Sequence, residues 1–430
     1  MSGPPSSVQI DRQIAALDLR IASVVDEVLH HPEYQALEAR WRGLAFVVER
    51  VSFGQNVRVS VCACPDDALR EDLEEAADVT RSWLFRTVYA AEYGQFGGTP
   101  FGAIFVDIAV ASSPRDVAFL RKFASVAAMA HAPAFFGAQP SLLQVATFAE
   151  LPYTTSLADA LTGPSSVAWN ALRDSEDSRY LGVALPRMLA RSTYADVTTR
   201  FAYRERATRL HERLWASPVF AIAVRVADSF ARYRSYLGML GGAEDEPAVV
   251  EDHPTLGDAA RKVTLEVTLA PRIEEQLGEL GIIAIGANAI ASTLRLARAP
   301  SLQRPRSFGT SDGGPAATLS FMLGTRLPYI MLASRFAHYL KLIERERIGS
   351  NATRAEIEAE LNKWLLQFVV ALDGAPPATR LRYPLRGGQV RLHDVEGDPG
   401  WYRMDVRLLP HLKYMAHAFT ISLVGKVETR

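Results

Sequence analysis

Residues 57–138 alternate between strand-like and helix-like stretches, and this alternation constrains the fold more than any other feature. Valines occupy every second position of VRVSVCA (57–63), which is the period of a strand with one buried face. A helix is expected over about 67–93, followed by AIFVDIAV, an apolar run typical of a central strand covered on both sides. A second helix, about 114–131, leads to a third strand, AFFGA. The pattern predicts a mixed α/β domain with helices crossing over a sheet.

Composition excludes several classes of protein. The 430 residues, 48% hydrophobic and 22% charged, are enough for two or three cores, so we expect a folded multi-domain chain. A net charge of −1 gives no global field that would attract nucleic acid. Cys62 and Cys64 are the only cysteines, too few for a disulfide framework or a zinc site, which favours the cytoplasm. The N-terminus does not resemble a signal peptide, and the longest apolar run, Leu280–Leu294, is too short to span a bilayer, so no membrane insertion is expected.

The N-terminal segment predicts one long helix with a narrow apolar seam. Its apolar residues follow at alternating steps of four and three, and the helix should end near His31 and Pro32. Fewer than three heptads are short for an autonomous coiled coil, so the seam needs a partner surface, within this chain or on another. The seam residues are Ile10, Ile14, Leu17, Ile21, Val24 and Val28.

The rest of the chain predicts a mostly helical middle and a β-rich end. Residues 167–240 look mostly helical, and loops are expected at GGAEDEPAVVEDHPT and at 304–317. Helices should return over 324–372 with a break near Gly349, followed by three short strands with exposed edges. In the last strand, Phe419, Ile421, Leu423 and Gly425 share one face. We therefore divide the chain into a partner-binding helix (1–32), an α/β domain (33–165), a helical or mixed middle region (166–323) and an inner domain with a β arm (324–430).

The segment SRFAHYLKLIERERIGS (334–350) offers the one arrangement that could suggest catalysis. Ser334 and His338 lie one helical turn apart, as a hydrolase might need. On a helix, however, the buried stripe is Phe336, Tyr339, Leu340 and Ile343, so His338 should point away from it among cations, with no carboxylate to orient it. We interpret this segment as a basic helix face for solvent or a partner, formed by Arg335, Lys341 and Arg345.

Other polar groups favour structural roles. Glu176, Asp177 and Arg179 could form a carboxylate pair beside an arginine, but adjacent carboxylates diverge and the arginine would keep a neighbour ionised. We expect these three residues to form a structural polar cluster. The glycines of GQFGGTPFG lack the spacing of a phosphate-binding loop, and the histidine pairs lack a third metal ligand. No catalytic residue, cofactor or metal is expected.

Six segments together carry a resemblance that covers nearly the whole chain, from about residue 10 to 427. The chain closely resembles the large subunit of the type VI secretion contractile sheath, the TssC/VipB family. The segments are HHPEYQALEARWRGL (30–44), EYGQFGGTPFGA (92–103), FASVAAMAHAPAFFGA (123–138), WNALRDSEDSRYLGVALPR (169–187), SRFAHYLKLIERERIGS (334–350) and PGWYRMDVRLLPH (399–411).

The resemblance implies a phage-tail-sheath-like fold and a bacterial structural protein, not an enzyme. Large subunits of this family pair with a small sheath subunit (TssB/VipA), and copies of the pair stack as a helical sheath around a tube of Hcp. Contraction drives the tube out through a baseplate. By this resemblance, the seam of 10–28 would pack with helices of the small subunit. Strands would be exchanged between subunits through Phe419, Ile421, Leu423 and Val427, and Arg335, Lys341 or Arg345 would face the tube or a neighbour.

One departure and two alternatives accompany the resemblance. Family members commonly carry several tens of residues before the HHP motif, including a helix recognised by the recycling ATPase ClpV, whereas here only ten residues precede the seam. We therefore expect disassembly by ClpV only if the small subunit or another segment supplies the signal. The alternatives are a sheath-like structural paralogue of another contractile particle, and a hydrolase using Ser334 and His338.

Overall fold

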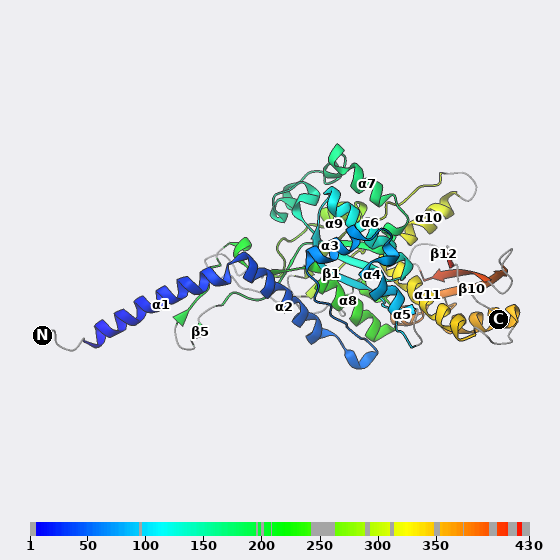
Figure 1. The fold of residues 1–430 in the computed structure, drawn as a ribbon, viewed down its shortest axis with the longest axis horizontal. Coiled ribbons are helices and arrows are strands. Elements are labelled where there is room, and N and C mark those ends of the chain that lie inside the picture. The colour runs from blue at the N-terminus through cyan, green and yellow to red at the C-terminus, as the bar shows by residue number, and fades with distance from the viewer. Residues whose placement is uncertain are drawn as a thin grey trace.

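The protein is described by a computed structural model, and its body has extensions at both ends (Figure 1). Helix α1 (Ser7–Leu29) projects from one side of the body, and the strands of the C-terminal region lie on the opposite side. The described residues are 6–93, 97–194, 197–198, 202–207, 209–241, 263–288, 293–309, 314–347, 353–372, 374–394, 402–411 and 419–423.

A five-stranded sheet forms the centre of the body. Its order is β1-β2-β3-β8-β9, with β1, β2, β3 and β8 parallel and β9 antiparallel to β8. The central strands β2 and β3 are buried at every position, as expected for strands covered on both faces. The strands are β1 (Ile104–Val110), β2 (Ala134–Ala138), β3 (Leu181–Leu185), β8 (Ile282–Asn288) and β9 (Thr293–Leu296).

Two expectations about strands are wrong. The run AIFVDIAV forms β1, which is an edge strand and only half-buried over its first four residues, so its apolar character did not indicate a central position. The alternating segment 57–63 belongs to no strand, although it is described throughout. The unit β1, helix α6 (Pro114–Met129) and β2 does form the predicted crossover, since β1 and β2 pair in parallel with Ile104 opposite Ala134.

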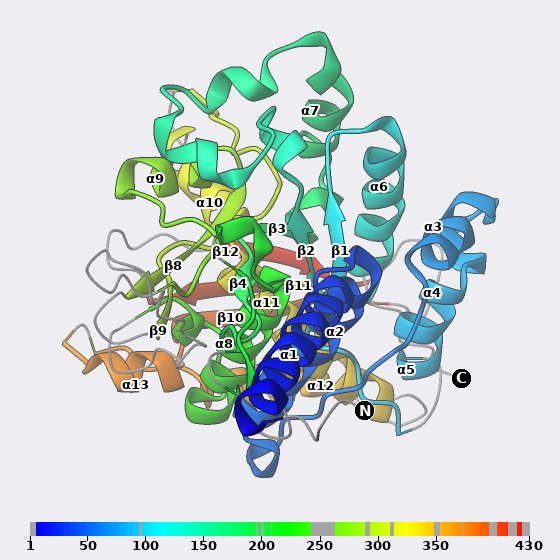
Figure 2. The same ribbon diagram turned by 90° about the vertical axis from the view of Figure 1, so that its left-hand side faces the viewer.

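Helices cover both faces of this sheet and bury two separate apolar clusters. Side chains alternate along the strands: Val183, Leu185 and Ile282 belong to one cluster, and Ala184 and Ile283 belong to the other. The first cluster packs under α6 together with α3 (Asp66–Glu75), α7 (Val167–Arg173) and α9 (Pro271–Glu279). The second packs under α2 (Pro32–Arg50) and α8 (Pro218–Tyr233), as Figure 2 shows for the layer below the sheet.

The predicted helix over 67–93 is broken. It begins as α3 but ends at Glu75, and the chain resumes with α4 (Trp83–Phe85), a π-helical turn and α5 (Ala91–Tyr93). The carboxylate of Asp72 accepts hydrogen bonds from the backbone N–H groups of Trp83 and Leu84, and it thereby links α3 to the start of α4.

The region 167–240 is less helical than predicted. It contains α7 and α8 but also β3 and two short antiparallel pairs, β4 (Met188–Leu189) with β7 (Trp215–Ala216) and β5 (Val197–Thr198) with β6 (Ala202–Tyr203). The central sheet takes strands from both 33–165 and 166–323, so these two predicted segments share one sheet. The domain boundaries themselves stay a prediction. Most of the expected loop GGAEDEPAVVEDHPT lies outside the described residues.

The C-terminal region has the expected order of helices followed by strands. Helices α11 and α12 pack against the face of a three-stranded antiparallel sheet, β10-β11-β12, and bury a third apolar cluster that includes Phe336, Leu361 and Val406. The elements are α10 (Gly314–Gly324), α11 (Leu327–Arg347), α12 (Arg354–Leu366), α13 (Pro377–Arg382), β10 (Leu385–Asp394), β11 (Tyr402–Pro410) and β12 (Phe419–Leu423).

Candidate interaction site

Helix α1 carries the predicted seam, and all six seam side chains are exposed. Ile10, Ile14, Leu17, Ile21, Val24 and Val28 keep between 42 and 60% of their surface accessible. The helix begins with a capping box, in which Ser6 and Gln9 satisfy each other's backbone N–H groups. At 23 residues, α1 is about 35 Å long. An apolar stripe of this length in water indicates a surface that another protein segment covers.

A different stripe of α1 faces the body. Ala22, Asp26 and Leu29 are its buried residues, and Ala22 and Leu29 pack with Tyr203 in a small apolar cluster that Val25 also contacts. At about 100° of rotation per residue, this stripe lies roughly 100° around the helix from the seam. The last two turns of α1 can therefore stay attached to the body while the seam remains free.

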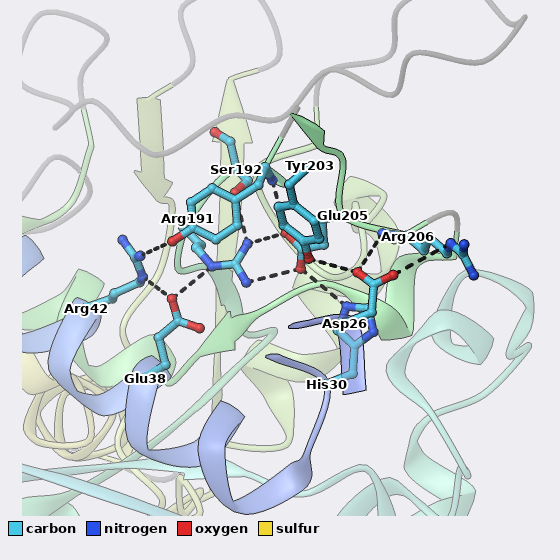
Figure 3. Close-up of polar contacts among 10 residues, drawn as sticks. Asp26, His30, Glu38, Arg42, Arg191, Ser192, Tyr203, Glu205 and Arg206 are labelled. Atoms are coloured by element: carbon cyan, nitrogen blue, oxygen red, sulfur yellow. Dashed lines mark hydrogen bonds and ion pairs between the residues drawn. The ribbon is translucent and has the colours of Figure 1, made fainter. Parts of the chain in front are cut away.

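A buried polar network, which we call the stem cluster, fixes the base of α1 (Figure 3). It joins α1 and α2 to the segment that carries the β5–β6 pair. At its α1 end, the carboxylate of Asp26 accepts a hydrogen bond of 2.8 Å from the hydroxyl of Tyr203 and one of 3.3 Å from the backbone N–H of Arg206. Burial and this bond both raise the pKa of Tyr203, so the tyrosine remains a donor. The cluster consists of Asp26, His30, Glu38, Arg42, Arg191, Tyr194, Tyr203 and Glu205.

Arg191 lies at the centre of the stem cluster. Its guanidinium donates to both carboxylate oxygens of Glu205, at 2.6 and 3.1 Å, and its Nε donates to Glu38 on α2 at 2.9 Å. Burial acts to raise the pKa of Glu205, but the hydrogen bonds from Arg191 and from the backbone N–H of Tyr194 outweigh it, and the pKa is lowered. The bidentate geometry suits a buried pair, because it compensates both charges for lost water.

His30 and Arg42 complete the stem cluster. Nε2 of His30 lies 3.3 Å from a carboxylate oxygen of Glu205. The guanidinium of Arg42 donates one hydrogen bond of 2.6 Å to Glu38 and one of 3.0 Å to the hydroxyl of Tyr194. The turn between α1 and α2 is thus held to residues more than 150 positions away. Sequence reasoning did not find this cluster. The available signal was Asp26, an acidic residue within the apolar stripe of Ala22, Val25 and Leu29.

A second exposed apolar stripe, also not predicted, runs along α2. The body-facing side of α2 buries Gly43, Phe46 and Val47. Apolar residues at steps of three, four and seven occupy the solvent side, where the indole of Trp41 is 65% exposed. The spacing is readable in PEYQALEARWRGL. The stripe residues are Tyr34, Leu37, Trp41 and Val48.

The predicted strand-exchange segment is paired within the chain. Strand β12 is bonded to β11 in antiparallel register, with Val406 opposite Ile421 and Leu408 opposite Phe419. Strands β10 and β12 are the two edges of this sheet. The side chains of Phe419, Ile421 and Leu423 lie outside the described residues, as does Val427 entirely. Exchange of this strand between subunits stays a prediction.

The expected orientation of His338 is wrong. His338 is only 7% exposed, and its Nε2 donates to the carbonyl of Ala130 at 3.0 Å, a carbonyl that also accepts from the hydroxyl of Tyr93. Ser334 is buried as well. The helix buries more than one stripe because α11 passes between the C-terminal sheet and the end of α6. With its ring bonded to a backbone carbonyl, His338 is not placed as the base of a hydrolase.

Two buried histidines meet at this junction between α6 and α11. The rings of His131 and His338 are 6.2 Å apart, and Nδ1 of His131 forms a 3.2 Å hydrogen bond with the hydroxyl of Tyr180. Burial lowers the pKa of His131 to about 3 and that of His338 to about 4, and the charge of Lys341 contributes in the same direction. Both rings are therefore neutral near pH 7.

Two basic residues of α11, Arg335 and Lys341, have partners inside the chain. The guanidinium of Arg335 lies 4.4 Å from the ring centre of Phe230 and donates to the carbonyl of Arg234. The ammonium of Lys341 lies 5.4 Å from the ring centre of Tyr93. The side chain of Arg345 lies outside the described residues. That these cations face a tube or a neighbouring subunit stays a prediction.

The polar group at 176–179 is small. The Nε of Arg179 donates to the backbone carbonyl of Glu176 at 3.1 Å. Burial raises the pKa of Asp177, the charge of Glu176 raises it further, and Arg179 opposes both. The role of these three residues as a structural cluster stays a prediction.

Both cysteines have free thiols, with Cys62 exposed and Cys64 half-buried. Over the described part of the chain, no three His, Cys, Asp or Glu side chains gather closely enough to hold a metal ion. No helix in the same residues has the length and apolar character that crossing a bilayer requires.

Comparisons with known proteins identify the family. Residues 11–303 match the family described as "EvpB/VC_A0108, tail sheath N-terminal domain", and residues 316–427 match "EvpB/VC_A0108, tail sheath gpW/gp25-like domain". The chain is 33% identical over 435 aligned residues to the type VI secretion system sheath protein TssC1 of Pseudomonas aeruginosa, covering 98% of this chain and 86% of that protein. The chain belongs to the TssC/VipB family of sheath proteins. As a family member it is a structural subunit of a type VI secretion contractile sheath, and the predicted resemblance is confirmed.

The solved structures that match the chain include one of a baseplate. It is a cryo-electron microscopy structure of the anti-feeding prophage baseplate, 10% identical, with a TM-score of 0.38 and coverage of 87% of this chain and 81% of that one.

Proposed function

We propose that this TssC/VipB chain forms a heterodimer with the small sheath subunit through the seam of α1. The seam supports this proposal, because six aliphatic side chains about half exposed on a projecting helix are left uncovered by the described body. Covering them would contribute roughly 1 kcal/mol per side chain, which is of the same order as the cost of association, and the apolar surface buried on the partner would add to it. The stem cluster supports it as well, since it fixes the direction in which the seam is presented.

The heterodimers would polymerise in the cytoplasm as a helical sheath around the Hcp tube and on a baseplate. The edge strands β10 and β12 support contacts between subunits, because unpaired edges accept further strands. Contraction would come from repacking of subunits into a state with more buried surface, so the chain would work without catalysis or a cofactor. A gain of about 1 kcal/mol per interface, summed over the many subunits of a sheath, would release a large free energy that can do mechanical work.

A pair of matched variants tests the seam. Leu17→Asp places a charge on the seam, and Ser23→Asp places the same charge on another exposed face of α1. Each chain would be co-expressed with the small sheath subunit, purified through a tag on the small subunit and viewed by negative-stain microscopy. We expect tubules with the wild-type and Ser23→Asp chains and loss of co-purification with Leu17→Asp. Tubules of Leu17→Asp at the wild-type yield would contradict the proposal.

A further inference from the structure

The segment 57–63 (VRVSVCA) has the sequence pattern of a strand but pairs with no strand among the described residues. It is fully described, and it runs between α2 and α3 without regular secondary structure, where Figure 2 shows it as a plain coil. Within the described residues, no backbone hydrogen bond joins 57–63 to any other segment. Strand β1 is the nearest sheet edge in terms of packing, since Val57 and Phe105 share one apolar cluster and Cys64 and Val106 contact the other. The two segments nevertheless exchange no backbone bond.

The segment 57–63 packs against the body at its two ends and is exposed to solvent between them. Val57 packs against the cluster under α8, and Cys64 packs against the cluster under α6. Between these anchors, Val59 is 37% and Val61 is 64% exposed. Residues 58, 60 and 62 of the opposite face are also exposed. A stretch held at its ends, with an alternating apolar face and with backbone N–H and C=O groups that bond to no described segment, has the features of an edge strand that accepts another strand.

The exposed valine face selects the kind of partner. If two copies of this chain paired 57–63 with each other, the result would be a two-stranded ribbon whose valines still faced water, and such ribbons are marginal. A strand that belongs to a sheet with its own core would both pair the backbone and cover the valines. Pairing would add about one hydrogen bond per residue, each with a net contribution of about 1 kcal/mol.

We propose that residues 57–63 are added as a strand to the sheet of a second polypeptide, with Val59 and Val61 entering that polypeptide's core. The second polypeptide is the small sheath subunit, and the assignment rests on the heterodimer proposed above. The added strand would give the interface a second, rigid contact beside the helical seam of α1.

Two adjacent substitutions and one exchange measurement test this strand addition. Val61→Asp charges the face that would enter the partner's core, and Ser60→Asp places the same charge on the opposite face. Both positions are exposed and make no described bond, so both chains should fold. We expect at least a tenfold weaker binding of the small sheath subunit for Val61→Asp and less than a threefold change for Ser60→Asp. Amide hydrogen exchange over 57–63 should slow at least tenfold in the wild-type complex relative to the free chain.

The outcomes separate this inference from the heterodimer itself. If the wild-type complex forms but the amides of 57–63 exchange as fast as in the free chain, or Val61→Asp binds like wild type, the strand addition is wrong and the heterodimer stands. If no wild-type complex forms, the proposed function is wrong. If exchange over 57–63 slows with concentration in the isolated chain, the partner is a second copy and our assignment is overturned.

Discussion

Helices α1 and α8 have similar apolar spacing but opposite surroundings. In α8, Val219, Ile222 and Val226 recur at steps of three and four and are buried against β1 and β2. In α1, the same steps produce a seam that the described body does not cover, because only the last two turns of this helix contact it. The comparison teaches that a helical period predicts which face needs a partner, whereas the location of that partner is decided by distant residues.

The largest effect should come from detaching α1 at its base. Arg191→Met removes the cation that Glu38 and Glu205 share. Of the described ion-pair partners, Glu38 then keeps only Arg42 and Glu205 keeps only His30. Breaking a buried pair in this way typically costs about 3–5 kcal/mol. We expect the free energy of opening at the end of α1 to fall by about that amount, measured by hydrogen exchange at the His30 amide, which bonds to the Asp26 carbonyl. Arg187→Met, which breaks the surface pair with Glu266, is the control and should cost less than about 1 kcal/mol. Equal effects of the two variants would contradict a special role for the stem cluster.

A smaller effect should distinguish the two apolar stripes directly. Ile222→Ala creates a cavity on α8 and should lower the free energy of unfolding by about 2–4 kcal/mol. Ile14→Ala removes the same atoms from the exposed seam of α1 and should change it by less than about 0.5 kcal/mol. Denaturant unfolding of both variants measures the difference. A cost above about 1.5 kcal/mol for Ile14→Ala would show that the isolated chain already covers its seam.

The smallest effect should come from acid and should act on the body only. The folded-state pKa values of His131 and His338 lie below the usual 6.5, so the unfolded chain binds more protons in acid. Their contribution to stability is present above about pH 6.5 and is lost as the pH falls toward 4. Lys341, Arg335, Tyr93 and Tyr180 surround the pair and offer no carboxylate to compensate a proton.

Replacement of one histidine measures this contribution. His338→Gln should remove roughly 1–2 kcal/mol of the stability difference between pH 6.5 and pH 5. His31→Gln, at an exposed site outside the junction, is the control. An unchanged pH dependence in His338→Gln would show that this ring is accessible to protons in the folded state.

Sequence reasoning succeeded where local pattern and structure coincide. The seam of α1, the unit from β1 to β2 and the helices before the C-terminal sheet follow from period and turn signals over 5–25 residues. It failed where the outcome depended on distant contacts. β1 became an edge strand because later strands joined the sheet on its other side, beyond β2. The segment 57–63 has the pattern of a strand, but no described strand forms backbone hydrogen bonds with it. His338 was expected in solvent because nothing in its own helix shows that the end of α6 packs over it.

The attachment of α1 has a mechanical consequence. Ile10 lies 16 residues before Asp26, so a load applied there acts on a lever arm about 24 Å long. The fulcrum is a set of buried charges whose separation is costly, whereas the arm itself is held by helical hydrogen bonds alone. Torque on the tip is therefore delivered through Asp26 and His30 to Tyr203 and Glu205, and from Glu205 through Arg191 to Glu38 on α2.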